Sequence, residues 1–103
     1  MARNIEAAQA CLEYVTHQMN TLKNKQKLAG AIAMLKVQAT QTFDMCAREA
    51  TQVFGGLGYT RGGQGEKVER LYREVRANVL GGGSEEIMID LGVRQAARKA
   101  SKL

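Results

Sequence analysis

The chain has 103 residues, of which 45% are hydrophobic and 24% charged, with a formal net charge of +5. This length allows one domain or part of one, close to the size at which burial on folding exceeds the entropy cost only modestly. The composition excludes a low-complexity chain, and no apolar run is long enough to cross a bilayer.

The cysteines, the histidine and the basic residues indicate which kinds of site and partner this chain can have. Cys11, Cys46 and His17 lack the close spacing of a zinc site, so we expect neither a bound metal nor a disulfide framework, and a reducing compartment. The basic charge permits contact with nucleic acid, acidic lipid or a phosphorylated ligand. The basic residues are spread along the chain and no aromatic residue is interleaved with them, so we expect a solvated basic surface and no nucleic-acid partner.

Helical periodicity begins near the N-terminus. Apolar residues recur in steps of three and four from Ile5 to Leu22, which predicts an amphipathic helix. A second series runs from Leu28 to Val53 and is rich in alanine, which favours helix and lets a neighbouring helix approach closely. We therefore expect this second helix to be long and buried on more than one side.

Glycine clusters divide the rest of the chain. Gly55 and Gly56 stop the second helix, and residues 57–65 are expected to form a loop. A third helix is predicted from Glu66, with an inner face formed by Val68, Leu71, Tyr72, Val75 and Val79. Residues 81–83, all glycine, end it, and Ser84 caps a short fourth helix. No strand pattern appears, so the predicted fold is all-α, an up-and-down bundle of three to four helices.

The two glycine clusters raise a functional question. Gln52 followed by the two glycines offers a side-chain amide beside exposed backbone N–H groups, a cradle for an anion such as pyrophosphate, although a plain helix cap also explains it. The triple glycine exceeds what a helix end needs and leads into a helix N-terminus, which favours phosphate or a polarised carbonyl oxygen. A flexible turn with a serine cap is the alternative there.

Three strings in this order carry a family resemblance: QVFGGLGYTR, VERLYREVR and GGGSEEIM. They resemble the patterns Q-x-F-G-G-x-G-Y, V-E-R-x-Y-R-D-x-R and G-T/S-x-E-I of the C-terminal α-helical domain of acyl-CoA dehydrogenases. Residues 3–8 and 33–52 are similar to two further segments of that domain, so the resemblance covers nearly the whole chain. It implies that residues 1–103 form a single partial domain that lacks the first helix of the bundle.

The resemblance also implies roles for the glycine clusters. In such enzymes the first pattern lies against the adenosine diphosphate part of FAD, usually the FAD held by a neighbouring subunit. This assigns cofactor contacts to Gln52, Val53, Phe54, Gly55 and Gly56. Ser84, Glu85 and Glu86 would contact FAD within the subunit, and Gly82 and Gly83 would lie at the thioester end of an acyl-CoA substrate.

One departure from the family matters for catalysis. In many members the glutamate that removes the α-proton stands at the position that Gly82 occupies here, so this chain lacks it at that position. Other members place this glutamate on an earlier helix of the same domain. Glu85 and Glu86 lie in a helix first turn, which stabilises their ionised form, so neither is expected to be the base. No catalytic residue is assigned to this chain, and we expect it to be inactive alone.

The reaction implied for the intact enzyme is α,β-dehydrogenation of acyl-CoA thioesters, in fatty-acid or branched-chain oxidation. The implied partners are acyl-CoA, further copies in a homodimer or homotetramer, and an electron-acceptor flavoprotein or oxygen. Two alternatives stay open: part of an acyl-CoA oxidase, or a helical interaction module without flavin. The terminal Ser101-Lys102-Leu103 matches a peroxisomal address, with the mitochondrial matrix or bacterial cytoplasm as alternatives.

Overall fold

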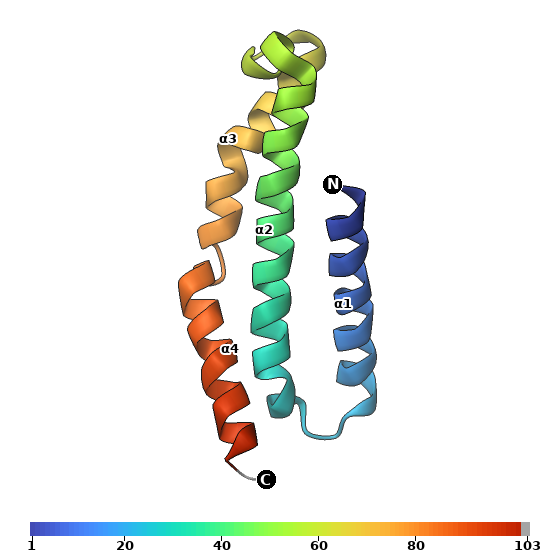
Figure 1. Ribbon diagram of the computed structural model, residues 1–103, viewed down its shortest axis with the longest axis vertical. Helices are drawn as coiled ribbons and strands as arrows, with labels where there is room; N and C mark the ends of the chain where they lie inside the picture. Colours follow the sequence, from blue (N-terminus) through green and yellow to red (C-terminus); the bar gives the residue numbers. More distant parts are fainter. Residues whose placement is uncertain (102–103) are drawn as a thin grey trace.

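The long helix α2 (Ala29–Phe54) is the central element of the chain. The computed structural model describes residues 1–101, so Lys102 and Leu103 of the predicted peroxisomal address lie outside the described residues. Helix α1 (Ala2–Thr21) packs along one side of α2, while α3 (Glu66–Leu80) and α4 (Glu85–Ala100) follow each other end to end along the other (Figure 1). The described part measures 55 × 24 × 18 Å. The predicted all-α, up-and-down arrangement is confirmed.

The two sides of α2 are used differently. Its buried residues Ala33, Val37, Thr40 and Ala47 recur at helical spacing, and α3 and α4 pack against α2. A second stripe, with Ile32, Leu35, Ala39 and Cys46, shares a groove with α1 and is only partly covered. In α1 itself Val15 is the one buried residue. The prediction that α2 is covered on more than one side is therefore confirmed, and the cover is denser on the side of α3 and α4.

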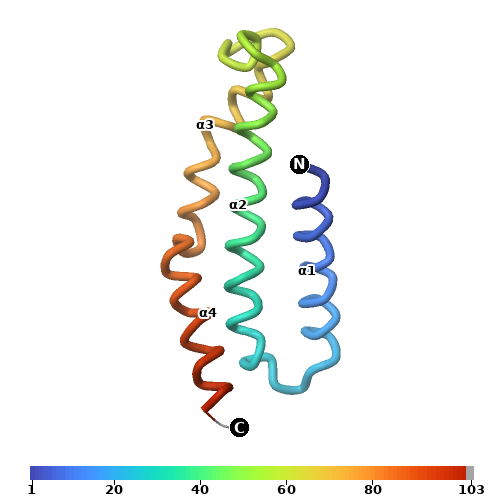
Figure 2. Tube along the Cα trace, viewed as in Figure 1, coloured from blue at the N-terminus to red at the C-terminus, as the bar shows by residue number. Residues whose placement is uncertain are grey.

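Small residues let α2 and α4 approach closely, as the composition of α2 predicts. A Cβ added at Gly92 would lie 2.7 Å from the sulfur of Met34, and one added at Gly30 would lie 3.0 Å from Cβ of Gln95. A larger residue at Gly30 would press on α4, whereas at Gly92 the flexible side chain of Met34 can move aside. The tube in Figure 2 shows α4 following the N-terminal half of α2 along most of its length.

Three details differ from the sequence predictions. The fourth helix has 16 residues and is longer than α3, and it keeps close contact with α2 beyond its first turns, at Gly92 and Gln95. The segment after α2 contains two 3₁₀ turns, Gly55–Tyr59 and Gly63–Gly65. Tyr72 was predicted on the inner face of the third helix but is exposed, and the buried residues of α3 are Val75 and Val79.

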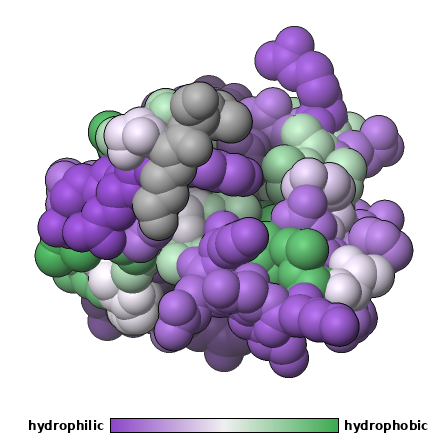
Figure 3. Space-filling view, turned by 90° about the horizontal axis from the view of Figure 1, so that it is seen from below, coloured by the Kyte–Doolittle hydropathy of each residue, from purple (hydrophilic) through white to green (hydrophobic). Residues whose placement is uncertain are grey.

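The end of the molecule that carries the α1–α2 connection and the end of α4 is mostly hydrophilic. Figure 3, which looks at this end from below, shows small apolar areas between polar ones. The connection contains a 3₁₀ turn, Lys25–Leu28, in which the side chain of Asn24 accepts a hydrogen bond of 3.1 Å from the Gln26 N–H. None of the helices in residues 1–101 combines the length and hydropathy that a bilayer crossing requires.

Candidate functional site

The first glycine bend closes α2 through its own backbone. Gly55 has φ +58°, which glycine adopts without the strain that a side chain would add, and its N–H donates to the carbonyls of Thr51 and Gln52. Gln52, Val53, Phe54, Gly55 and Gly56 are all exposed, and Val53 keeps 76% of its surface in contact with solvent. A Cβ added at either glycine would meet no atom within 4 Å. The bend therefore presents open backbone beside two uncovered apolar side chains.

The loop behind this bend is tightly packed. Gly65, buried at the start of α3, lies so close to the turn above it that an added Cβ would stand 1.8 Å from the carbonyl oxygen of Leu57. Gly58 is buried against the last turns of α2. The sequence gives no sign of which glycine makes the close contact, because residues 55–65 contain several at irregular spacing.

The second glycine bend joins α3 to α4. Gly82 has φ +73° and Gly83 has φ +112°, two consecutive residues in backbone conformations that side chains disfavour. The Gly83 N–H donates to the carbonyl of Leu80 at 3.3 Å, and the Gly81 N–H donates to Ala77 at 3.0 Å. At two of the three positions, Gly82 and Gly83, the positive φ therefore explains why the residue is glycine.

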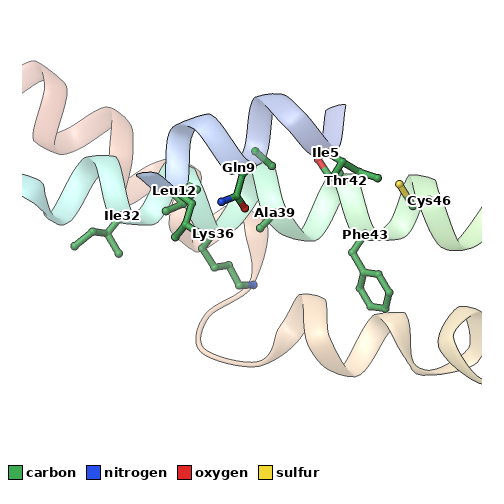
Figure 4. A pocket seen from close by; sticks show the side chains of 11 residues that line it. Ile5, Gln9, Leu12, Ile32, Lys36, Ala39, Thr42, Phe43 and Cys46 are labelled. Atoms are coloured by element: carbon green, nitrogen blue, oxygen red, sulfur yellow. The ribbon is translucent and has the colours of Figure 1, made fainter. Parts of the chain in front are cut away.

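A lysine from α2 reaches this second bend. The Lys36 ammonium donates to the carbonyl of Gly83 at 2.6 Å and to the carbonyl of Val79. Figure 4 shows its side chain extending from α2 toward the connection between α3 and α4. Four residues further along α2, the Thr40 hydroxyl lies 2.7 Å from Oε1 of Glu85, in the first turn of α4.

Ser84 and Glu86 complete the start of α4. Ser84 occupies the predicted N-cap position, but its hydroxyl makes no capping hydrogen bond to the backbone. The backbone N–H of Glu86 and the Ser84 hydroxyl hold the pKa of the Glu86 carboxyl below its usual value, and the charges of Arg76 and Lys36 act in the same direction.

The structure brings some predicted site residues together and separates others. Gly82 to Glu86 form one continuous turn, whereas Gln52 to Gly56 lie beyond the other end of α3. Because α3 has 15 residues, its length alone separates the two bends by about 22 Å. They cannot line one small groove within a single chain.

A well-defined apolar groove lies elsewhere. It has a volume of about 540 Å³ and lies between α1 and α2, lined by Ile5, Ala8, Gln9, Leu12, Ile32, Leu35, Lys36, Ala39, Thr42, Phe43 and Cys46. Its walls are mainly aliphatic and aromatic, and it includes none of the predicted cofactor or substrate residues. Among residues 1–101, no three His, Cys, Asp or Glu side chains gather closely enough to hold a metal ion.

The comparisons with known proteins agree with this helical architecture. Residues 1–97 match the family model described as "Acyl-CoA dehydrogenase, C-terminal domain". The chain therefore belongs to the acyl-CoA dehydrogenase family, and the predicted resemblance is confirmed. No solved structure matched the chain.

Three curated relatives illustrate the match. The chain is similar to acyl-CoA dehydrogenase AFT10-1 of Alternaria alternata, with 38% identity over 103 residues, 95% of this chain and 24% of the relative. It is 34% identical over 97 residues to acyl-CoA dehydrogenase apdG of Emericella nidulans, 91% of this chain and 22% of that one. It is 39% identical over 70 residues to probable acyl-CoA dehydrogenase YdiO of Escherichia coli K12, 68% of this chain and 18% of that one. The chain thus spans about a quarter or less of the length of these relatives.

Lys36 and Thr40 were not among the residues predicted for the second bend. A signal for Lys36 exists in the sequence, since a lysine between Leu35 and Val37 on a mainly apolar helix needs a polar partner. What the sequence does not show is that the partner is a pair of backbone carbonyls 43 and 47 residues later.

Proposed function

We propose that this chain is the C-terminal helical part of an FAD-dependent acyl-CoA dehydrogenase, which removes hydrogen from the α and β carbons of acyl-CoA thioesters. In that enzyme this part contacts the flavin and the thioester and contributes to the oligomer interface. The observation that carries the proposal is the second bend, where two glycines with positive φ lead directly into the N-terminus of α4. Membership of the family supports it.

The residues of the second bend fit the thioester side of such a site. Gly82 is exposed, and an added Cβ would meet no atom within 4 Å, so a substrate can lie against bare backbone there. The N-terminus of α4 carries two carboxyl groups, Glu85 and Glu86, in its first turn. A phosphate would meet like charge from the ionised Glu86, so this turn suits a polarised carbonyl oxygen better than a pyrophosphate.

The residues of the first bend fit the cofactor and not the thioester. Gln52 offers an exposed amide, and Gly55 and Gly56 offer backbone with free space above it. No carboxylate lies in residues 50–60, so a phosphate there meets no acidic side chain of that segment. We assign this bend to the adenosine diphosphate part of FAD held by another subunit, which would also cover Val53 and Phe54.

Bound FAD would accept the hydride that leaves the β-carbon. The α-proton needs a base, and the carboxylates of this bend are poorly suited to that role. Glu85 is turned toward α2 and accepts the Thr40 hydroxyl, and the lowered pKa of Glu86 makes it a weaker base than an ordinary glutamate. The base is therefore assigned to a part of the enzyme outside these residues.

A chimera tests the proposal. The segment of Alternaria alternata AFT10-1 that matches this chain is replaced by residues 1–103, and the purified chimera is examined for flavin absorbance and for bleaching on addition of acyl-CoA. We expect bound flavin and bleaching in the chimera, and neither in the 103-residue chain alone. A well-folded chimera that purifies without flavin would contradict the proposal, and turnover by the chain alone would contradict its dependence on other segments.

The apolar groove between α1 and α2 favours a second candidate, a helical interaction module without flavin. Flavin retention in the chimera distinguishes the two candidates. An acyl-CoA oxidase is separated from a dehydrogenase by the full-length enzyme of this chain, because an oxidase would release hydrogen peroxide in the absence of an added electron acceptor.

A further inference from the structure

The carbonyl groups at the end of α3 are satisfied by a distant side chain. The last four carbonyls of a helix have no partner within the helix, and a glycine in the left-handed conformation usually supplies one locally. Gly81, at the C-cap of α3, has φ −61° and ψ +134° and is extended. The carbonyl of Val79 instead accepts a hydrogen bond from Lys36, which also binds the carbonyl of Gly83 on the far side of the bend.

Charge and burial both favour this arrangement. Lys36 is half-buried, and its aliphatic stem lines the apolar groove between α1 and α2. A cation in such surroundings needs hydrogen-bond acceptors, and the C-terminal end of α3 supplies them together with the negative end of its helix dipole. Figure 4 shows the stem of Lys36 among the groove residues and its nitrogen directed toward the bend.

Thr40 holds the other side of the same bend. Its hydroxyl lies 2.7 Å from Oε1 of Glu85 and 3.1 Å from the carbonyls of Lys36 and Val37. A hydroxyl has one hydrogen to donate, and the nearest acceptor is the carboxyl oxygen. Lys36 and Thr40 are separated by one turn of α2, so they contact the end of α3 and the start of α4 from a single rigid element.

We propose that Lys36 and Thr40 are positioning residues, which together fix the backbone of residues 81–84. Three glycines in succession have many accessible conformations, and the two contacts select the one in which Gly82 and Gly83 have positive φ. The direction of the peptide groups that face a ligand is then set by α2. The consequence for catalysis rests on the proposed function, whereas the positioning itself does not.

Amide hydrogen exchange on the ¹⁵N-labelled 103-residue chain tests the positioning. Lys36→Met keeps the stem that lines the groove and removes the ammonium, and Lys67→Met, at an exposed position of α3, is its control. We expect Lys36→Met to accelerate exchange of the Gly81 and Gly83 amides about tenfold or more, with unchanged rates in the middle of α2. Equal rates at these glycines in the folded variant would overturn the proposal, as would a uniform acceleration over all helices.

A second set of three variants tests the positioning if Lys36→Met does not fold. Thr40→Val removes the hydroxyl at nearly constant shape, Thr40→Ser retains it, and Thr42→Val removes a buried hydroxyl that does not contact Glu85. We expect severalfold faster exchange of the Met88 amide, which donates to the Ser84 carbonyl, in Thr40→Val alone. Equal effects of Thr40→Val and Thr42→Val would overturn the role of Thr40.

The catalytic consequence is measured in the chimera with AFT10-1. Lys36→Met is expected to lower kcat about tenfold with the helical content unchanged, and Lys67→Met to leave kcat as it was. Unchanged kcat and KM in Lys36→Met would contradict the link to catalysis. A wild-type chimera without flavin would contradict the proposed function, while the exchange experiment would still decide on the positioning.

Discussion

The two glycine bends look alike in the sequence and are held in different ways. The bend at Gly55 and Gly56 closes on the last carbonyls of its own helix and leaves its side chains exposed. The bend at residues 81–83 is fixed from outside by Lys36 and Thr40 of α2. The first is a locally determined surface, and the second depends on tertiary structure, so substitutions should affect them differently.

The largest effect is expected in the loop that supports the first bend. Gly65→Ala would place a methyl group 1.8 Å from the Leu57 carbonyl oxygen, a backbone atom that cannot rotate away. We expect a loss of about 3 kcal/mol in the free energy of unfolding, at the upper end of typical overpacking costs. Urea denaturation at fixed protein concentration measures it. Gly56→Ala, where an added Cβ has no neighbour within 4 Å, is the matched control.

If both variants unfold at the same urea concentration, the close contact between Gly65 and Leu57 does not exist in solution. If Gly56→Ala is the more damaging of the two, the first bend is packed and not open. Either result would remove the contrast between a supporting loop and an exposed bend.

The second largest effect is expected within the second bend. Gly83→Ala forces a side chain onto a residue with φ +112° and brings its Cβ to 2.0 Å from the terminal methyl of Met88. Met88 is flexible and can move aside, so backbone strain dominates, and we expect a cost of about 2 kcal/mol. Thermal unfolding measures the loss. A Gly83→Ala, Met88→Ala double variant that regains wild-type stability would show that the clash and not the strain was the cause.

Residue patterns were sufficient to predict the helices, but they did not predict the tertiary contacts that fix the second bend. The three-and-four spacing of apolar residues and the glycine stops located all four helices, because these signals are local in sequence. The length of α4 was underestimated, since its contact with α2 through Gly30 and Gly92 is a tertiary feature. The partners of Lys36 lie 43 and 47 residues away, and no periodicity connects positions so far apart.

The site was partly predictable for the same reason. The need for glycine at the second bend follows from the triple repeat, and the structure assigns it to Gly82 and Gly83 in particular. The roles of Gln52 to Gly56 and of Ser84 to Glu86 toward FAD came from the family resemblance and stay predictions. The hydroxyl of Ser84 was expected to cap α4, whereas it makes no capping hydrogen bond and contributes to lowering the pKa of the Glu86 carboxyl.

A matched pair of glycines sharpens the comparison at a smaller scale. Gly55 and Gly82 have similar positive φ, +58° and +73°, and an added Cβ at either would meet no atom within 4 Å. Gly55 has ψ −136°, outside the left-handed helical region, so a local strain of about 1–3 kcal/mol is expected for alanine at each position. The first bend is free to relax, whereas Lys36 and Thr40 hold the second, so Gly82→Ala should destabilise the chain more than Gly55→Ala. Urea midpoints of the two variants compare them directly, and the reverse order would contradict the anchoring of the second bend.

The smallest effect concerns protonation at the second bend. The pKa of Glu86 is lowered from 4.5 by its own backbone N–H and by the Ser84 hydroxyl. Ionised Glu86 therefore stabilises the folded state above pH 4.5, and this contribution is lost as the pH falls through the lower folded-state pKa. A ¹³C carboxyl titration should give a midpoint below 4.5 for Glu86, and Ser84→Ala should move it upward without restoring the usual value, because the backbone donor remains. A midpoint that does not respond to Ser84→Ala would show that the serine hydroxyl is directed elsewhere, free to meet a ligand as the family resemblance implies.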